Sequence, residues 1–238
     1  MGRAFEYRKA RKMKRWASMA KAFTKIGREI AIAVKEGGGD PEYNPRLRLA
    51  INNAKAANMP KANVDSAIKR AMSKDAANYD EVVYEGYGPN GVAVMIETAT
   101  DNTNRTVASM RLIFSKGGGN LGNSGEVDYM FTRKGQFKVS AEGRDMEELE
   151  LELIDHGLED LQQEEDELVL TTAFEDFGTM QKALEDMGIE VANAELVRIP
   201  SHTKKLDDDG EEAMIKLIDK LEEDDDVVNV FHNMDMNE

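Results

Sequence analysis

The sequence predicts a multidomain α and α+β protein, in which an N-terminal three-helix domain precedes two ferredoxin-like, βαββαβ-type α+β domains. Apolar residues recur at helical spacing through about the first 74 residues, whereas strand and helix patterns alternate from residue 79 onward. The alternating part contains two βαββαβ sets, one inside the other. We therefore expect a basic helical domain at 1–76, a discontinuous α+β domain at 77–133 plus 196–238, and an inserted α+β domain at 134–195. A linear pair of domains is the alternative.

Three helices are expected in the N-terminal domain. The first covers about 16–36 and ends at three glycines, 37–39. Its apolar stripe consists of Phe23, Ile26, Ile30 and Val34. Asn44 is a typical capping residue for a second helix with Pro45 at its first position, and a third helix begins at Pro60.

After residue 79 the pattern predicts short strands and amphipathic helices in alternation. The expected strands are 92–100, 126–131, 136–140, 159–162, 168–172, 189–199 and 227–232, and the expected helices are 104–116, 145–156, 174–187 and 209–223. The inner set lies within 134–195. The outer set takes its first βαβ from 92–131 and its second from about 195–232.

Charge divides the chain into a basic head and an acidic body. Residues 1–74 contain 18 Lys+Arg and 6 Asp+Glu, whereas the remaining residues contain 13 and 40, and the whole chain has a net charge of −15. A cationic surface attracts polyphosphate, so this division favours nucleic-acid contact through the head over a merely solvated helical surface. The candidate contacts are Arg11, Lys12, Lys14, Arg15, Lys21, Lys25, Arg28, Arg46, Arg48, Lys55, Lys61, Lys69 and Arg70. Alanine at positions 21, 25 and 28 is expected to weaken binding and flatten its salt dependence.

A glycine-rich segment, KGGGNLG at 116–122, is the second candidate contact region, because its backbone amides could approach a phosphate or an RNA backbone. A helix C-cap followed by a turn is the alternative interpretation. The candidate contacts here and nearby are Tyr87, Arg105, Lys116, Gly118 and Asn120.

Several function classes lack support in the sequence. The chain has no cysteine, and its three histidines, His156, His202 and His232, are far apart, so neither a metal site nor a catalytic triad is expected. The G-x-G-x-x-G pattern at 86–91 leads into a strand instead of a helix, which argues against dinucleotide binding. We expect no enzyme activity, no cofactor, no metal and no membrane partner. The expected location is cytoplasmic.

Several motifs together resemble one known family. These are FTKIGREI (23–30), GGGDPEYNPRLR (37–48), NMPKANVDSAIKRA (58–71), YEGYGPNG (84–91), DNTNRTV (101–107), FSKGGGNLG (114–122), GEVDYMF (125–131) and LIDKLEEDDDVVNVFHN (217–233). On them the chain is identified as similar to the YebC/PmpR family from about Phe23 onward. The resemblance implies three domains, with the third inserted in the second, and no catalytic residue or cofactor. Members commonly begin with a G-H-S-K-W-x-N-type segment, whereas this chain begins GRAFEYRKA.

Two functions follow from the resemblance and the charge. Family members are usually described as DNA-binding transcriptional regulators, and this is the first expectation for the chain. A mitochondrial member activates translation of cytochrome c oxidase, and bacterial relatives are connected with ribosomes stalled on proline-rich chains. The alternative is therefore a ribosome-associated translation factor that binds rRNA or tRNA, with the acidic body facing basic proteins. Counterion release acts on DNA and RNA alike, so charge does not separate the two.

Overall fold

The structure is a computed structural model, and it describes residues 19–236. It begins with a unit of three helices: α2 (Met19–Gly37), α3 (Pro45–Ala56) and α4 (Lys61–Ala71). Asn44 caps α3 as expected, because its Oδ1 accepts a hydrogen bond from the Leu47 amide at 3.0 Å. Its Nδ2 also donates to the carbonyls of Ala33 and Gly38, so one buried side chain joins the end of α2 to the start of α3.

The helical unit has a core of its own. It consists of Ile26, Ile30, Ala33, Val34, Leu47, Ala50, Ala54, Val64 and Ala71. Three of the four residues of the predicted apolar stripe of the first helix lie in this core. The fourth, Phe23, is only half-buried and lines a groove between α2 and α4.

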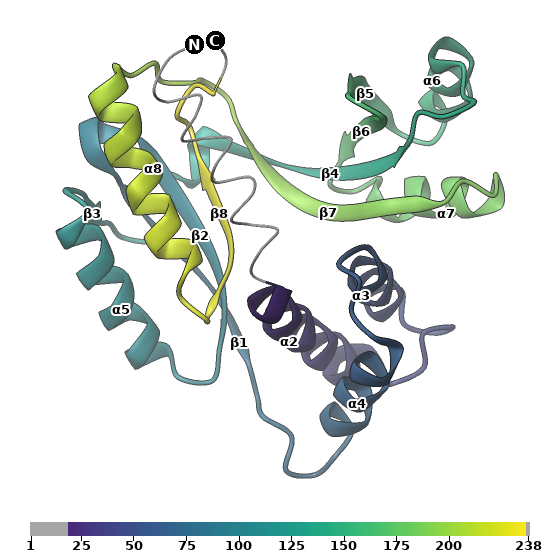
Figure 1. Cartoon of the computed structure of the whole chain (residues 1–238), viewed down its shortest axis with the longest axis horizontal. Coiled ribbons are helices and arrows are strands. Elements are labelled where there is room, and N and C mark those ends of the chain that lie inside the picture. The colour runs from purple at the N-terminus through teal and green to yellow at the C-terminus, as the bar shows by residue number, and fades with distance from the viewer. Residues whose placement is uncertain (1–18, 237–238) are drawn as a thin grey trace.

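The first sheet has the strand order β3-β1-β2-β8, and every pairing in it is antiparallel. Its strands are β1 (Asp80–Tyr87), β2 (Ala93–Thr100), β3 (Asn120–Leu121) and β8 (Val227–His232). The short 3-10 helix η1 (Pro89–Gly91) connects β1 to β2. Helices α5 (Thr103–Lys116) and α8 (Asp208–Glu222) cover one face, as Figure 1 shows, and enclose a core that includes Val94, Ile96, Phe114 and Ile218.

The second sheet is formed entirely by the segment between Phe131 and Pro200. Its strands are β4 (Phe131–Ser140), β5 (Leu158–Glu164), β6 (Glu167–Ala173) and β7 (Val191–Pro200), in the order β5-β6-β4-β7. Helices α6 (Met146–Ile154) and α7 (Phe177–Asp186) complete a βαββαβ unit with antiparallel pairing throughout. A separate core fills it, centred on Phe137, Leu153, Leu170 and Leu184.

The expected fold class, a three-helix domain followed by an α+β region with two four-stranded antiparallel sheets, is confirmed. The expected strand at 126–131 is wrong. The 3-10 helix η2 (Asp128–Met130) lies there, because the buried Glu85 carboxylate accepts hydrogen bonds from the backbone amides of Gly125, Val127 and Asp128. These amides are thereby withdrawn from any β ladder.

The strands and helices that form the outer of the two predicted sets also differ from the expectation. Its first sheet starts from the hairpin β1–β2, and β1, which was not predicted as a strand, is an inner strand. The two-residue strand β3 takes the place expected for 126–131. The order β1-β2-α5-β3 followed by α8-β8 is therefore not βαββαβ.

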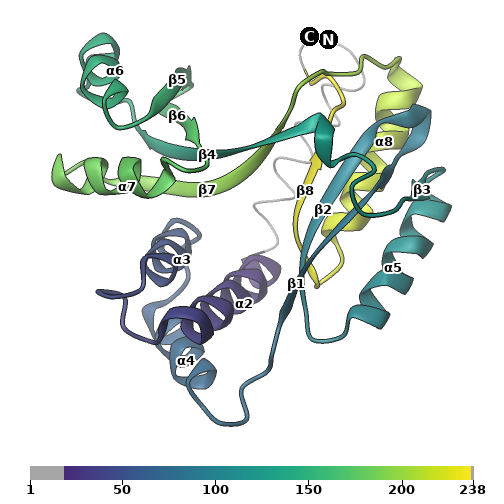
Figure 2. The ribbon, with the colours of Figure 1, turned by 180° about the vertical axis from the view of Figure 1, so that it is seen from behind.

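The two ten-residue strands β4 and β7 run from the first sheet out to the second unit, as Figures 1 and 2 show from opposite sides. Helix α3 of the helical unit packs against β7. Asn53 of α3 exchanges two hydrogen bonds with the backbone of Ala194, at 2.9 and 3.3 Å. Within residues 19–236 no helix is long and apolar enough to cross a bilayer.

Candidate nucleic-acid interface

The predicted basic contacts on α2 point toward the first sheet. Arg28 Nη1 donates to the carbonyl oxygens of Ala99 at 2.9 Å and Asp225 at 2.6 Å, and to Asp226 Oδ1 at 2.9 Å. Lys21 Nζ donates to the carbonyl of Glu223 at 2.8 Å, and Lys25 reaches that of Glu222 at 3.5 Å. The three side chains therefore form one intramolecular contact between α2 and residues 222–226.

This contact has a simple electrostatic origin. Residues 222–226 follow the C-terminal end of α8, where the last carbonyls of a helix lack partners and carry partial negative charge. The run is also acidic in sequence, with five consecutive Asp or Glu residues. Cations from another helix can satisfy such carbonyls as well as lysines of the same helix would. The basic face of α2 thus already has an anionic partner within the chain.

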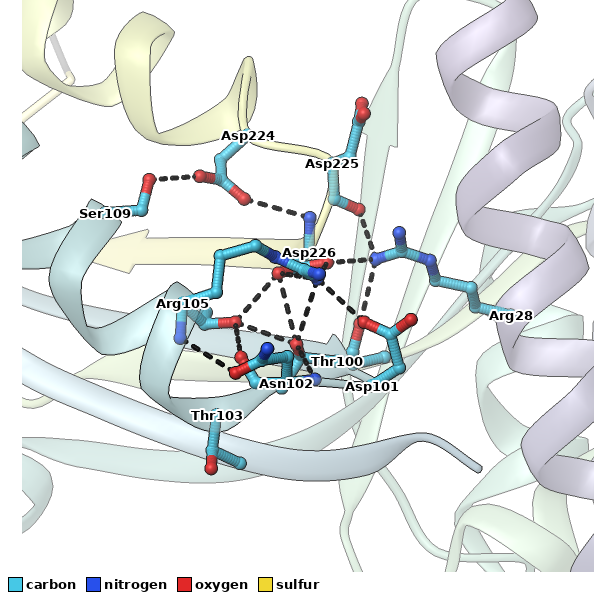
Figure 3. A network of polar contacts seen from close by, with 12 residues as sticks. Arg28, Thr100, Asp101, Asn102, Thr103, Arg105, Ser109, Asp224, Asp225 and Asp226 are labelled. Atoms are coloured by element: carbon cyan, nitrogen blue, oxygen red, sulfur yellow. Dashed lines mark hydrogen bonds and ion pairs between the residues drawn. The ribbon is translucent and has the colours of Figure 1, made fainter. Parts of the chain in front are cut away.

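Asp226 is the centre of the polar network drawn in Figure 3. Its side chain is 5% exposed and accepts hydrogen bonds from Arg28, from Arg105 Nη2 at 2.8 and 3.0 Å, and from Thr100 and Thr106 at 3.1 and 2.8 Å. Burial alone would raise the pKa of Asp226, but the hydrogen bonds from these donors hold it below its usual value. Asp226 is therefore ionised and bound to two guanidinium groups.

Arg105, a predicted loop contact, belongs to this network. It also pairs with Asp101 at 2.8 Å, and its side chain is 52% exposed. Both of its acidic partners lie within the chain, so its charge is compensated internally.

Two arginines of α3 are engaged as well. Arg46 pairs with Glu36 at 2.8 Å and with Glu81 at 2.5 Å, which links the helical unit to the start of β1. Arg48 donates to the carbonyls of Pro41 and Glu42 at 2.8 and 3.0 Å, which holds the connection between α2 and α3.

Four predicted contacts of the helical unit remain exposed and without a side-chain partner among residues 19–236. These are Lys55 at the end of α3 and Lys61, Lys69 and Arg70 on α4. We call them the free cations. Lys61 and Lys69 lie two turns apart on one face, with Asp65 between them. The predicted contacts Arg11, Lys12, Lys14 and Arg15 lie outside the described residues.

The glycine-rich segment is shaped by close packing. A Cβ on Gly119 would lie 2.4 Å from the Tyr87 carbonyl oxygen, and one on Gly117 would lie 2.7 Å from Leu217. Gly118 has a φ of +76° and is exposed, and Lys116 is exposed without a side-chain partner in the described part of the chain. Asn120 is exposed and pairs with Tyr87 in the sheet, and Tyr87 is half-buried against Ala93 and Met95.

The structure also contains a groove that sequence reasoning missed. It lies between α2, α4 and residues 76–79 and has a volume of about 570 Å³. Phe23, which was predicted to be a core residue, and Arg70, which was predicted as one of many basic contacts, both line this groove. Gly27, for which no role was predicted, lines it as well. A glycine in the middle of an amphipathic helix was the available signal, because glycine disfavours helix. Within residues 19–236 there is no group of three or more acidic or histidine side chains that could hold a metal ion.

Comparison with known proteins identifies relatives over nearly the whole chain. The family model described as the TACO1/YebC protein N-terminal domain matches residues 3–74, and that described as the TACO1/YebC second and third domain matches residues 79–234. A "Probable transcriptional regulatory protein" of Porphyromonas gingivalis is 56% identical over 235 residues, covering 98% of this chain and 97% of the relative. A protein of the same name from Myxococcus xanthus is 48% identical over 239 residues, covering 98% of this chain and 100% of the relative.

A solved structure is similar in fold and sequence. The crystal structure of a conserved hypothetical protein from Aquifex aeolicus has a TM-score of 0.82 and 42% identity, covering 92% of this chain and 91% of that one. The two curated relatives bear the names of regulatory proteins, which agrees with the expectation that the chain is not an enzyme.

Proposed function

The chain belongs to the TACO1/YebC family, and on that premise we propose that it is a DNA-binding transcriptional regulator that contacts the phosphate backbone through its helical unit. The observation that carries this proposal is the set of free cations: Lys55, Lys61, Lys69 and Arg70 are exposed and lack side-chain partners among residues 19–236. Exposed lysine and arginine side chains bind phosphate by charge and release counterions from the polyanion. The α2 cations are bound to residues 222–226 and contribute less in this state.

The predicted domains act as three units in this proposal, namely 1–76, 77–133 plus 196–238, and 134–195. Each unit has a hydrophobic cluster built mainly from its own residues, which supports the division. The acidic units would be repelled by a polyanion, so they orient the helical unit toward it. They also offer a surface for basic protein partners.

A ribosome-associated translation factor is the second candidate. The observation that favours it is the presence of exposed, unpartnered cations on two units of the described chain, because Lys116 and Arg111 lie on α5, away from α4 in Figure 1. Folded RNA is a polyanion large enough to contact both at once.

The test compares two charge-matched double variants. Lys61→Ala with Lys69→Ala removes two free cations of α4, whereas Lys182→Ala with Lys205→Ala removes two exposed lysines of the acidic units. Affinity for duplex DNA is measured at several salt concentrations. We expect the α4 variant to reduce the slope of log K against log[salt] by about 2, since each phosphate contact contributes about 0.9. The control variant should leave the slope unchanged.

Equal slopes for the α4 variant and the wild type would exclude α4 as the contact surface. Ribosome co-sedimentation and DNA footprinting of the wild type then separate the two candidates. A sequence-specific footprint without co-sedimentation supports the transcriptional regulator, and co-sedimentation with only nonspecific DNA affinity supports the translation factor.

A further inference from the structure

The groove between α2 and α4 combines a cation, polar groups and aromatic rings. Arg70, Ser66 and Asn63 lie at helical spacing on the face of α4 that lines it. All three are exposed, and the Arg70 side chain has no partner in the described part of the chain. Phe23 of α2 and Tyr79, which precedes β1, supply half-buried aromatic rings. The volume of about 570 Å³ falls within the range of small-molecule sites.

Gly27 gives an independent indication that the groove is kept open. It lies in the middle of α2, where glycine is the poorest helix former after proline. Packing elsewhere explains other glycines, since a Cβ would lie 2.7 Å from Asn44 at Gly37 and 2.4 Å from Met72 at Gly39. A Cβ at Gly27 would meet nothing within 4 Å. No neighbour within residues 19–236 therefore requires a glycine at position 27, and its side of α2 faces the groove.

The two aromatic rings differ in how they are held. The guanidinium carbon of Arg28 lies 5.4 Å from the centre of the Tyr79 ring, and Arg28 itself is fixed by Asp226. This cation–π contact positions Tyr79 at the groove. Phe23 has no comparable contact within residues 19–236 and lines the groove from α2.

We propose that this groove takes one unpaired nucleotide of a single-stranded segment, with its phosphate at Arg70 and its base against Phe23 and Tyr79. The inference rests on the proposed nucleic-acid binding and specifies the form of the polyanion. Aromatic side chains stack on bases only where the base faces are open, as in single strands, loops and ends. The amide of Asn63 can donate to and accept from the polar edge of the base, whereas the Ser66 hydroxyl donates to the Ala62 carbonyl at 2.6 Å and is left as an acceptor. The bare backbone at Gly27 allows a planar group to approach α2 closely.

The test narrows the groove without removing a contact. Gly27→Leu adds a side chain where there is open space, and leucine is a better helix former than glycine, so the variant should be at least as thermally stable as the wild type. Gly27→Ala is the matched control, because one methyl group leaves most of the groove open. Binding is measured by fluorescence anisotropy with an eight-nucleotide RNA, the DNA of the same sequence, and a blunt DNA duplex.

We expect Gly27→Leu to weaken binding of single strands by about tenfold, the lower part of the range for losing one stacked base, and to change duplex binding by less than about twofold. Gly27→Ala should bind all three probes as the wild type does. Arg70→Ala should weaken binding of single strands more than binding of the duplex. Lys69→Ala, on the other face of the same helix, should weaken both equally.

Wild-type affinity of Gly27→Leu for single strands, or an equal loss for single strands and duplex, would overturn the inference. If duplex binding still depends on Lys61 and Lys69 in that case, the proposed function survives and only the groove is excluded. Failure of the wild type to bind any of the three probes would overturn both. The RNA and DNA arms show which sugar the bound strand carries.

Discussion

Replacing Asp226 with asparagine should destabilise the junction of α2 with the first sheet by about 3 kcal/mol. The substitution keeps the size of the side chain and removes its charge. Asp226 bonds the guanidinium groups of Arg28 and Arg105, and the exposed fractions of the Arg28 and Asp226 side chains are 15% and 5%. Figure 3 shows that both arginines converge on this one carboxylate.

The magnitude follows from the separate contacts. A buried hydrogen bond between charged groups contributes about 1.5–3 kcal/mol, and this applies to the Arg28 contact. The Arg105 contact adds little, because its guanidinium is half-exposed and Asp101 also pairs with it. Loss of the hydrogen bonds from Thr100 and Thr106 costs little. Each hydroxyl can rotate to another acceptor, and the two hydroxyl oxygens lie 2.8 Å apart, within hydrogen-bond distance of each other. The loss is therefore about 1.5–3 kcal/mol from the Arg28 contact, and the Arg105 contact moves it toward the upper end of that range.

Thermal unfolding followed by circular dichroism is the assay. For a chain of this size, about 3 kcal/mol lowers Tm by about 6–12 °C. The control is Asp225→Asn, because Asp225 is exposed and contacts Arg28 through its main-chain oxygen, which the substitution keeps. We expect the control to lie within about 0.5 kcal/mol of the wild type. Equal Tm values for Asp226→Asn and Asp225→Asn at pH 7 would show that the Asp226 carboxylate does not stabilise this junction.

The pH dependence gives a second check on Asp226. Its pKa is lower in the folded chain, so the native carboxylate stays ionised where the unfolded one would bind a proton. The stabilisation is therefore fully present above the unfolded pKa of about 3.9 and is lost as the pH falls through the folded value. The difference in Tm between the wild type and Asp226→Asn should be full at pH 7 and shrink below about pH 4.

Three further predictions concern other sites. Burial raises the pKa of Glu29 to about 7, so the native state holds a proton that the unfolded state releases, and stability should fall as the pH rises from about 4.5 to about 7. Glu29→Gln should remove this pH dependence, which Tm measurements at a series of pH values would show. At pH 8 the variant should be about 2 kcal/mol more stable than the wild type, which is less than the whole pKa shift implies because the Glu29 side chain is partly exposed. Glu85→Gln should cost about 2 kcal/mol and speed hydrogen exchange at the amides of residues 125, 127 and 128, which its carboxylate now holds; unchanged exchange would contradict the assigned contact. Gly119→Ala should cost about 1–3 kcal/mol in urea unfolding, because its Cβ would lie 2.4 Å from a backbone oxygen, whereas Gly178→Ala, with nothing within 4 Å, should cost nothing.

Local patterns predicted much of the fold. Asn44 followed by Pro45 placed the start of α3, and the valines and phenylalanine of 227–232 placed β8. The inner βαββαβ unit was predicted because each of its elements carries its own periodicity. These features depend on residues close in sequence.

The errors arose where distant residues decide the structure. The segment 126–131 alternates like a strand, but the Glu85 carboxylate of β1 binds the amides of residues 125, 127 and 128 and prevents pairing. The strand β1 itself was not predicted, although it lies inside the first sheet. Its partners on both sides come from later in the chain.

In the candidate interface, too, some features follow from the sequence and others depend on contacts between distant residues. Composition alone located the basic residues in the head and the acidic residues in the body, because the charge of a side chain follows from its residue type. It could not distinguish Arg28, bound to Asp226, from Arg70, which faces a groove, because the two arginines have the same chemistry. Composition and periodicity thus establish which charges and helices the chain has. Which cations remain available depends on contacts between distant residues, because the fold brings residues 222–226 against α2 and leaves the cations of α4 exposed.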